Sequence, residues 1–372
     1  MSSVLLIDNV RHLGGDPLDL LIEEGRIAAM APGLPLPAGA ERLAGGGRLL
    51  LPALVEAHTH LDKTLWGLPW RPNTAGETLA SMIENERAVL AAVGGPAIER
   101  SRALLYRLVA FGSLAVRSHV DIHPEIGLAS LEAMIALRSD LQGSVALQVI
   151  AFPQQGLLSR PGTEALMREA AGIGIDGLGG LDPAGIDGDP EGQLRFLFDL
   201  AAERDLALDI HLHDRGQLGL WQLESIAAHA RERGLGGRTM VSHAYCLGTA
   251  GEGALQRLAD HLAQAGVAIM TTAPADGPAP PVKALRAAGV TVCSGSDGIR
   301  DAWSPLSSGD QLERAWLMAL RFDWARDEDL ALAFDCVSGQ AAAALGLAAH
   351  GQAGGQRADL GLLPAERRGE GV

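Results

Sequence analysis

The chain has 372 residues, 47% of them hydrophobic and 20% charged, so it can bury the core of one large α/β barrel or of two ordinary domains. Its 45 acidic and 30 basic residues give a net charge of −15, which argues against binding to nucleic acid or to an anionic membrane. Its three cysteines form no Cys-x-x-Cys pair, and its first residues read as a strand and not as a signal peptide. We therefore expect a cytoplasmic protein.

The first 50 residues are typical of short strands joined by turns. Residues 4–7 are apolar, and residues 18–30 predict a hairpin that turns at Glu24 and Gly25. Residues 358–364 are strand-like again, so we expect this tail to return to the N-terminal strands. The sequence predicts a small composite β-sandwich domain from residues 1–50 and 351–372, and a second domain over residues 51–350.

Beyond this module, apolar runs alternate with helical patterns. Strands are predicted over residues 49–57, 114–122, 145–152, 174–181, 207–212, 239–244, 267–272 and 290–294. Helices are predicted over residues 192–203, 217–233, 253–265 and 310–324, and an earlier one beginning at a capping box of Thr74 and Glu77. Eight strands alternating with helices favour an α/β protein with a (β/α)8 TIM-type barrel. A doubly wound open sheet is the alternative, but no Gly-x-Gly-x-x-Gly turn follows an early strand.

His58 and His60 stand at the end of the first predicted barrel strand. Residues two apart on a strand point to the same side, so the two imidazoles project together and can both coordinate one divalent metal ion. Further polar residues end the other predicted strands; they are His119, Gln154, His211, His213, Asp214, His243 and Asp297. In a (β/α)8 barrel these strand ends meet at one face. Three imidazoles and one carboxylate suit zinc or ferrous iron, which lowers the pKa of a bound water.

Several segments spread over the barrel region resemble the amidohydrolase superfamily, and within it the cytosine deaminase-like group. They are His58-Thr-His-Leu-Asp62 and residues 116–121, 148–156, 209–211, 241–243, 294–297 and 301–303. The resemblance implies that one divalent ion, Zn or Fe, is held by His58, His60, His211 and Asp297. It also implies that Asp297 accepts a proton from the water, that His243 orients the water, that Gln154 reads the amide edge of a ring, and that Trp303 forms a pocket wall.

Two positions depart from the pattern of that group. Asp214 stands where the group has a glutamate, and Gly298 stands where it has a second aspartate after the metal ligand. We expect Asp214 to act as the acid and base, the alternative being a carboxylate paired with Arg215. Lys63 is expected to meet an anionic or carbonyl-rich substrate, and His119 either to contact the substrate or to support the metal ligands.

The sequence thus predicts a hydrolase of carbon–nitrogen bonds other than peptide bonds. The expected reaction is deamination of a nitrogen heterocycle, in which a metal-activated hydroxide attacks the ring carbon that bears an exocyclic amine. The first alternative is hydrolysis of a cyclic amide or an N-alkylamino triazine-like compound, and the second is a catalytically inert metal-binding protein. The expected partner is a small heterocyclic substrate, with neither nucleic acid nor membrane. A homo-oligomer is also expected, because the C-terminus ends soon after Pro364.

Overall fold

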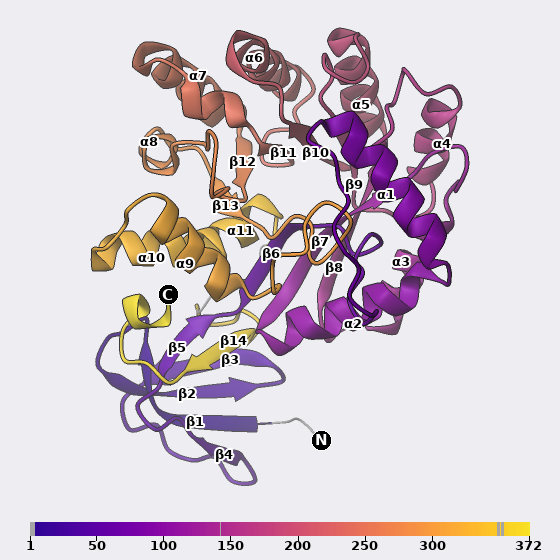
Figure 1. The fold of residues 1–372 in the computed structure, drawn as a ribbon. Helices are drawn as coiled ribbons and strands as arrows, with labels where there is room; N and C mark the ends of the chain where they lie inside the picture. Colours follow the sequence, from indigo (N-terminus) through magenta and orange to yellow (C-terminus); the bar gives the residue numbers. More distant parts are fainter. Residues whose placement is uncertain (1–3, 142, 348–349, 351–352) are drawn as a thin grey trace.

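The computed structural model describes residues 4–141, 143–347, 350 and 353–372, and its larger sheet is an eight-stranded parallel barrel (Figure 1). The barrel strands follow one another in chain order as β6 (Leu54–Thr59), β7 (Ser113–Asp121), β8 (Ala146–Phe152), β9 (Gly177–Leu181), β10 (Ala207–Leu212), β11 (Thr239–His243), β12 (Val267–Thr271) and β13 (Val292–Ser294). This arrangement confirms the predicted (β/α)8 fold.

The first and last barrel strands meet just beyond β13. Thr59 forms a parallel bridge with Asp297, whose backbone N–H donates to the His58 carbonyl over 2.8 Å. Gly295 makes this approach feasible, because a Cβ atom there would lie 2.6 Å from the His58 nitrogen. The closure therefore sets Asp297 beside the two histidines of β6.

Helices pack around the outside of the barrel (Figure 1). Their bounds are α1 (Leu79–Val93), α2 (Ala97–Ala110), α3 (Ala129–Asp140), α4 (Thr163–Ala170), α5 (Pro190–Arg204), α6 (Gly216–Glu232), α7 (Glu252–Ala265), α8 (Val282–Ala287), α9 (Gln311–Arg321), α10 (Asp327–Cys336) and α11 (Gly339–Ala344), with 3₁₀ turns η1 (Tyr245–Thr249) and η2 (Arg368–Gly371). Aliphatic side chains of the strands and helices form one large buried cluster between the two layers. Among the described residues, none of the helices combines the length and the apolar character that crossing a bilayer requires.

The predicted start of the first helix was wrong by one turn. Thr78, not Thr74, is the N-cap, and its hydroxyl accepts from the Ser81 backbone N–H over 3.2 Å. Ser81 replaces Glu77 as the reciprocal partner, since its hydroxyl accepts from the Thr78 N–H. Thr74 instead donates to the Asn85 side chain from the preceding loop.

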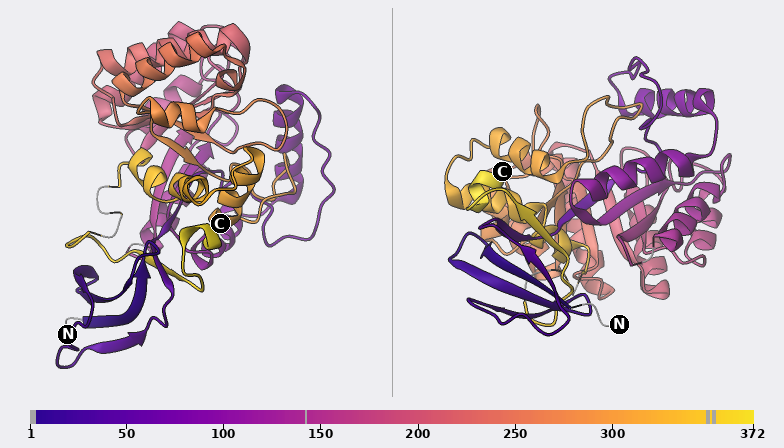
Figure 2. Two further views of the ribbon diagram at one scale, coloured as in Figure 1. Left: turned by 90° about the vertical axis from the view of Figure 1, so that its left-hand side faces the viewer. Right: turned by 90° about the horizontal axis from the view of Figure 1, so that it is seen from below.

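The smaller sheet has six strands and is built from both ends of the chain. Its members are β1 (Val4–His12), β2 (Pro17–Glu23), β3 (Arg26–Ala31), β4 (Glu41–Ala44), β5 (Leu49–Pro52) and β14 (Leu360–Leu363). Glu24 and Gly25, both at positive φ, form the predicted hairpin turn between β2 and β3. Figure 2 shows this sheet at the end of the barrel away from α1.

The single strand predicted over residues 49–57 is two strands in the structure. β5 pairs with β14 in the small sheet, and β6 starts two residues after β5 ends and pairs with β7 in the barrel. Pro52 ends β5, and proline has no N–H to donate to a ladder. The predicted domain boundary between residues 50 and 51 stays a prediction, although β5 extends the small sheet to Pro52.

Candidate metal centre and substrate cavity

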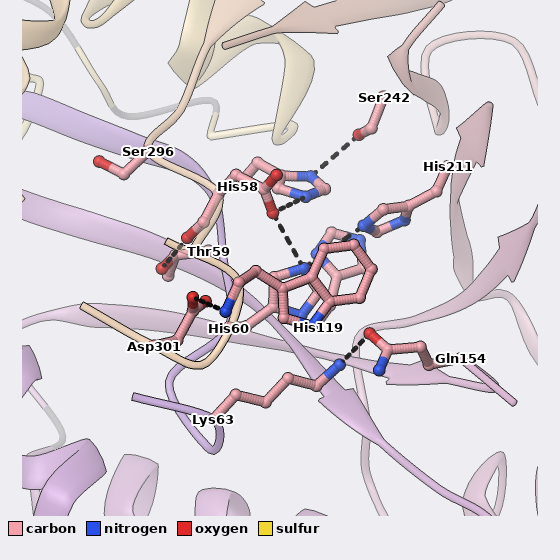
Figure 3. A network of polar contacts seen from close by, with 12 residues as sticks. His58, Thr59, His60, Lys63, His119, Gln154, His211, Ser242, Ser296 and Asp301 are labelled. Carbon is pink, nitrogen blue, oxygen red and sulfur yellow. Dashed lines mark hydrogen bonds and ion pairs between the residues drawn. The ribbon is translucent and has the colours of Figure 1, made fainter. Parts of the chain in front are cut away.

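Four of the predicted residues converge at the carboxyl ends of β6, β10 and β13 (Figure 3). His60 Nε2 lies 3.2 Å from Asp297 Oδ1 and 3.4 Å from His211 Nε2. His58 Nε2 lies 3.6 Å from the same Asp297 oxygen. All three imidazoles are buried, so residues far apart in the chain present their donor atoms to one small dry volume.

This donor set fits a small divalent ion. Zinc ligands stand about 2.0–2.2 Å from the metal, which places two ligand atoms of a tetrahedral site about 3.3–3.6 Å apart, as these atoms are. His58 Nε2 is buried and has no hydrogen-bond partner among the described residues. A buried nitrogen without a partner is costly, and a metal ion would satisfy it.

Two overlapping groups of side chains surround this point. The ligand atoms of His58, His211, His243 and Asp297 all lie within 4.8 Å of one another, and so do those of His58, His60, His119 and His211. His119 is fully buried, with Nε2 3.4 Å from Asp209 Oδ2, and it is not among the described residues that line the cavity below. His119 thus lies beside His58, His60 and His211 and outside the described cavity lining, and its role stays a prediction.

The local electrostatics keep the donors in metal-binding forms. Burial, with a smaller effect of Lys63, lowers the pKa of His60 to about 3, and burial also holds the pKa of His211 well below its usual value. Burial raises the pKa of Asp297, but contacts with His58 and His60 outweigh it and hold that pKa well below its usual range. Neutral imidazoles and an ionised carboxylate are the states that bind a cation.

Ser242 on β11 fixes the ring of His58. Its hydroxyl donates to Asp209 Oδ1 over 2.6 Å and lies 2.9 Å from His58 Nδ1. Because the hydroxyl proton is already given to Asp209, we assign the proton of the second contact to His58 Nδ1. That tautomer leaves the lone pair of His58 Nε2 directed at the ligand cluster. Arg117 donates to Asp209 Oδ2 over 3.2 Å and so holds the carboxylate that accepts from Ser242.

Ser242→Ala is therefore expected to lower metal affinity by about 10–100-fold, because His58 loses the group that sets its tautomer. The measurement is a competitive zinc titration with a chromogenic chelator. Ser294→Ala is the matched control: it removes another buried strand hydroxyl, one that donates to the Thr271 carbonyl and does not touch the ligands. Equal zinc affinities for wild type and Ser242→Ala would contradict the assigned tautomer.

Two residues of the centre have strained backbones. His243 and Asp297 have φ values of 73° and 60°, in the left-handed region that side chains other than glycine rarely adopt. Gly298 follows, and a Cβ atom there would lie 2.0 Å from Asp301 Oδ2. The Asp301 carboxylate thus occupies the space that a second aspartate at position 298 would need.

A cavity of about 780 Å³ opens above the ligand cluster. Its lining includes the polar side chains of Lys63, Glu86, Gln154, His213, His243 and Asp297, which we call the polar wall. It also includes the apolar side chains of Pro274, Leu306, Leu317 and Leu320, which we call the apolar wall. A cavity with a few convergent polar groups and an apolar wall is typical of a small-molecule site.

Comparisons with known proteins agree with this architecture. The Amidohydrolase family profile matches residues 45–368. The chain belongs to the amidohydrolase family. The resemblance predicted from the sequence is confirmed, and the protein is a hydrolase acting on carbon–nitrogen bonds.

Three similar proteins show which activities occur among relatives of this chain. The crystal structure of N-isopropylammelide isopropylaminohydrolase from Burkholderia multivorans is 45% identical, with a TM-score of 0.95 over 99% of this chain and 93% of that one. That of 5-methylcytosine deaminase from Klebsiella pneumoniae with 5-fluorocytosine is 29% identical, with a TM-score of 0.86 over 98% and 92%. N-isopropylammelide isopropyl amidohydrolase from Pseudomonas sp. is 30% identical over 328 residues, 85% of this chain and 80% of that protein.

Three of the four predicted substrate contacts, Lys63, Gln154 and Trp303, line the cavity. Lys63 Nζ donates to Gln154 Oε1 (Figure 3), and both side chains are almost fully buried. Burial alone would lower the pKa of Lys63, but nearby carboxylates, Glu86 foremost, raise it above its usual value, so Lys63 is a cation. Trp303 is held by its backbone N–H, which donates to Asp301 Oδ1 over 2.8 Å. The buried Trp303 Nε1 has no hydrogen-bond partner among the described residues, and Trp303 lines the cavity.

The structure does not bring Asp214 to the reacting centre. Its Oδ2 accepts from the Gly185 backbone N–H over 3.1 Å and from Gln222 Nε2 over 2.9 Å, and Asp214 is not among the described residues that line the cavity. Its carboxylate serves to tie the loop after β9 to α6. The physical reason is that Asp214 is three residues after His211, so alternation continued past the end of β10 turns its side chain away from the ligands.

His213 occupies the cavity in place of Asp214. Its Nδ1 lies 2.8 Å from Asp182 Oδ2, and its ring stacks on His243 with centroids 4.4 Å apart. His213 and His211 are two residues apart, so alternation continued past the end of β10 turns both side chains to the same side. Asp182, at the end of β9, is the sequence feature that could have indicated a functional role for His213, because a carboxylate beside an imidazole orients the ring.

Proposed function

We propose that this amidohydrolase is a metal-dependent aminohydrolase that removes an alkylamine or ammonia from a nitrogen heterocycle. The observation that carries the proposal is the cavity itself: it joins the ligand cluster to a polar wall that can hold ring amides and to an apolar wall that can hold an alkyl group. His58, His60, His211 and Asp297 would hold one divalent ion. When bound, such an ion supplies an activated water at neutral pH and polarises a carbonyl or ring carbon.

Asp297 and His243 are placed to handle that water. Asp297 Oδ2 lies 4.0 Å from His243 Nε2, so both groups face the same point. The ionised carboxylate of Asp297 takes the proton of the attacking water. Burial, reinforced by His213, holds the pKa of His243 well below its usual value, and the neutral ring orients the water.

His213 is the group best placed to transfer that proton onward. The contact with Asp182 fixes Nδ1, which leaves Nε2 to exchange a proton with a ligand in the cavity. As the new carbon–oxygen bond forms, His213 delivers a proton to the amine nitrogen. The carbon–nitrogen bond then breaks and the neutral amine leaves, while the second proton of the water passes to the ring nitrogen and the ring keeps the oxygen as a carbonyl.

The substrate class follows from the two cavity walls. The Lys63 ammonium and the Trp303 indole N–H are donors, so they favour a ring that carries carbonyl oxygens. Leu306 and Leu320 are 73% and 65% exposed yet line the cavity, which marks them as an apolar surface open to a ligand. These features, with the similarity to N-isopropylammelide hydrolases, favour an N-alkylamino triazinone.

A direct deaminase acting on a pyrimidine is the second candidate. Gln154 favours it, because a side-chain amide can read the amide edge of a pyrimidinone, and a similar protein is a 5-methylcytosine deaminase. The same centre would then release ammonia and not an alkylamine. The apolar wall would have no group to hold, which is why we rank this reaction second.

A substrate panel tests the proposal. Zinc-loaded protein is incubated with N-isopropylammelide, 5-methylcytosine and cytosine, and the released isopropylamine and ammonia are quantified by chromatography. We expect isopropylamine release with kcat/KM in the common enzyme range of about 10⁴ M⁻¹s⁻¹ or above. Ammonia release from the pyrimidines alone would support the second candidate. No turnover of any compound by metal-loaded protein would contradict both.

A further inference from the structure

Helix α1 has an unusual burial pattern. All its residues are described, and the one buried side chain among them is Glu86, while apolar residues such as Leu79, Met82 and Ile83 remain partly exposed. An ordinary surface helix buries an apolar stripe and exposes its acids. A carboxylate is almost never fully buried unless it is paired, so the buried position of Glu86 needs a specific explanation.

Glu86 reaches the polar wall of the cavity. Its Oε1 accepts from Gln154 Nε2 over 2.6 Å and lies 3.5 Å from Lys63 Nζ. Glu86 is 2% exposed, and its Oε2 is buried with no hydrogen-bond partner among the described residues. Since Glu86 itself lines the cavity, this oxygen is an acceptor still available beside two groups that already pair with each other.

The helix is tied to the loop that holds Trp303. Asn85 Nδ2 donates to the Ala302 carbonyl over 3.3 Å, and Asn73 Nδ2 donates to the Trp303 carbonyl over 3.0 Å. Figure 2 shows α1 and its long flanking loop at the end of the barrel opposite the small sheet. These contacts therefore hold the helix that carries Glu86 against the loop that carries Trp303, and both residues line the same cavity.

We propose that Glu86 is a substrate-binding residue that selects rings carrying an N–H next to a carbonyl. The inference rests on the proposed function, and it specifies which ring edge of the substrate, an N–H beside a carbonyl, forms hydrogen bonds with the polar wall. Glu86 Oε2 accepts a hydrogen bond from the ring N–H, and the Lys63 ammonium donates to the neighbouring ring carbonyl. Aromatic triazines without a ring N–H present only lone pairs to this carboxylate, so the site rejects them.

The chemical consequence is a preference for lactam tautomers. A carboxylate accepts and cannot donate, whereas an ammonium donates and cannot accept. Side by side, Glu86 and Lys63 match a donor followed by an acceptor on the ring edge, which is the pattern of a cyclic amide, imide or urea. Cytosine also carries this pair, as its N1–H beside the C2 carbonyl, so Glu86 and Lys63 select against aromatic triazines and not against cytosine.

The test compares Glu86→Gln with wild type and with Glu84→Gln, all as full-length zinc-loaded protein. Glu86→Gln keeps the shape and removes the charge, while Glu84 is exposed on the same helix and pairs with Arg87, so it serves as the control. The probe for binding is 1,3,5-triazine-2,4,6-trione, the ring that hydrolysis of N-isopropylammelide would leave. Its Kd is measured by calorimetry, alongside zinc content, Tm, and kcat and KM for N-isopropylammelide.

We expect Glu86→Gln to raise the Kd of the trione and the KM by about 10–100-fold, the loss of one hydrogen bond to a charged group, with one zinc per chain and an unchanged Tm. Glu84→Gln should match wild type. Values of Kd and KM within about twofold of wild type would overturn the inference, as would lost zinc, a lowered Tm, or failure of the wild type to bind the trione. Binding that depends on Glu86 without turnover of any panel compound would instead refute the proposed reaction alone.

Discussion

Asp297→Ala and His211→Ala are expected to strip the divalent ion from the protein and to lower kcat/KM by at least about 10³-fold. The reason is that a bound ion contributes several kcal/mol of transition-state stabilisation, and each 1.36 kcal/mol is a factor of about ten in rate. Asp297 Oδ1 lies within 3.6 Å of two imidazole nitrogens, so its removal leaves three neutral histidines and no anionic ligand. Metal content by mass spectrometry and steady-state kinetics measure the two effects.

His261→Ala is the control for these variants, because His261 is an exposed histidine on α7, remote in the chain from the ligands. It should retain one ion per chain and wild-type kinetics. If Asp297→Ala kept both its metal and its turnover, the assignment of this carboxylate as a ligand would fail.

His213→Asn and Asp182→Asn are expected to keep the metal and to lower kcat by about 10²–10⁴-fold, the usual contribution of a positioned acid or base. His213 loses its titrating ring in the first variant and its orienting carboxylate in the second, since Asp182 Oδ2 lies 2.8 Å from Nδ1. Because the ligand cluster is untouched, KM and metal content should change far less than kcat. Stopped-time assays with metal analysis of each variant check the prediction.

Asp214→Asn supplies the contrast with the neighbouring position. The sequence favours Asp214 as the proton-transfer group, but its carboxylate binds the Gly185 N–H and the Gln222 amide outside the cavity. An asparagine can keep the first of these contacts, so kcat should stay within a few-fold of wild type. A large loss of rate in Asp214→Asn with a normal rate in His213→Asn would reverse the assignment.

The ligand cluster could be predicted from the sequence because strand geometry is regular. His58 and His60 are two positions apart at the end of an apolar run, and parallel strands of a barrel bring such ends to one face. The same rule placed His211 and Asp297 among the strand-end candidates, and the resemblance to the amidohydrolase superfamily implied that they are ligands. The fold followed from the count of alternating strands, although Pro52 divided the first predicted strand into β5 and β6.

Sequence reasoning assigned the proton-transfer role to Asp214 and not to His213, although strand geometry favours His213. Alternation continued past β10 turns His213, two residues after His211, to the same side and Asp214 to the other, and the contact with Asp182 holds the His213 ring. Glu86 comes from a helix outside the strand-end pattern, and its sequence neighbours Asn85 and Arg87 give no sign of burial. Only the contacts with Lys63 and Gln154 reveal it.

The most direct test of the metal centre is a crystal structure of the zinc-loaded protein with anomalous data collected on both sides of the zinc edge. The account predicts one anomalous peak per chain, about 2.0–2.2 Å from nitrogen atoms of His58, His60 and His211 and from an oxygen of Asp297. A protein that binds no stoichiometric ion, or a peak that lies away from Asp297, would contradict it.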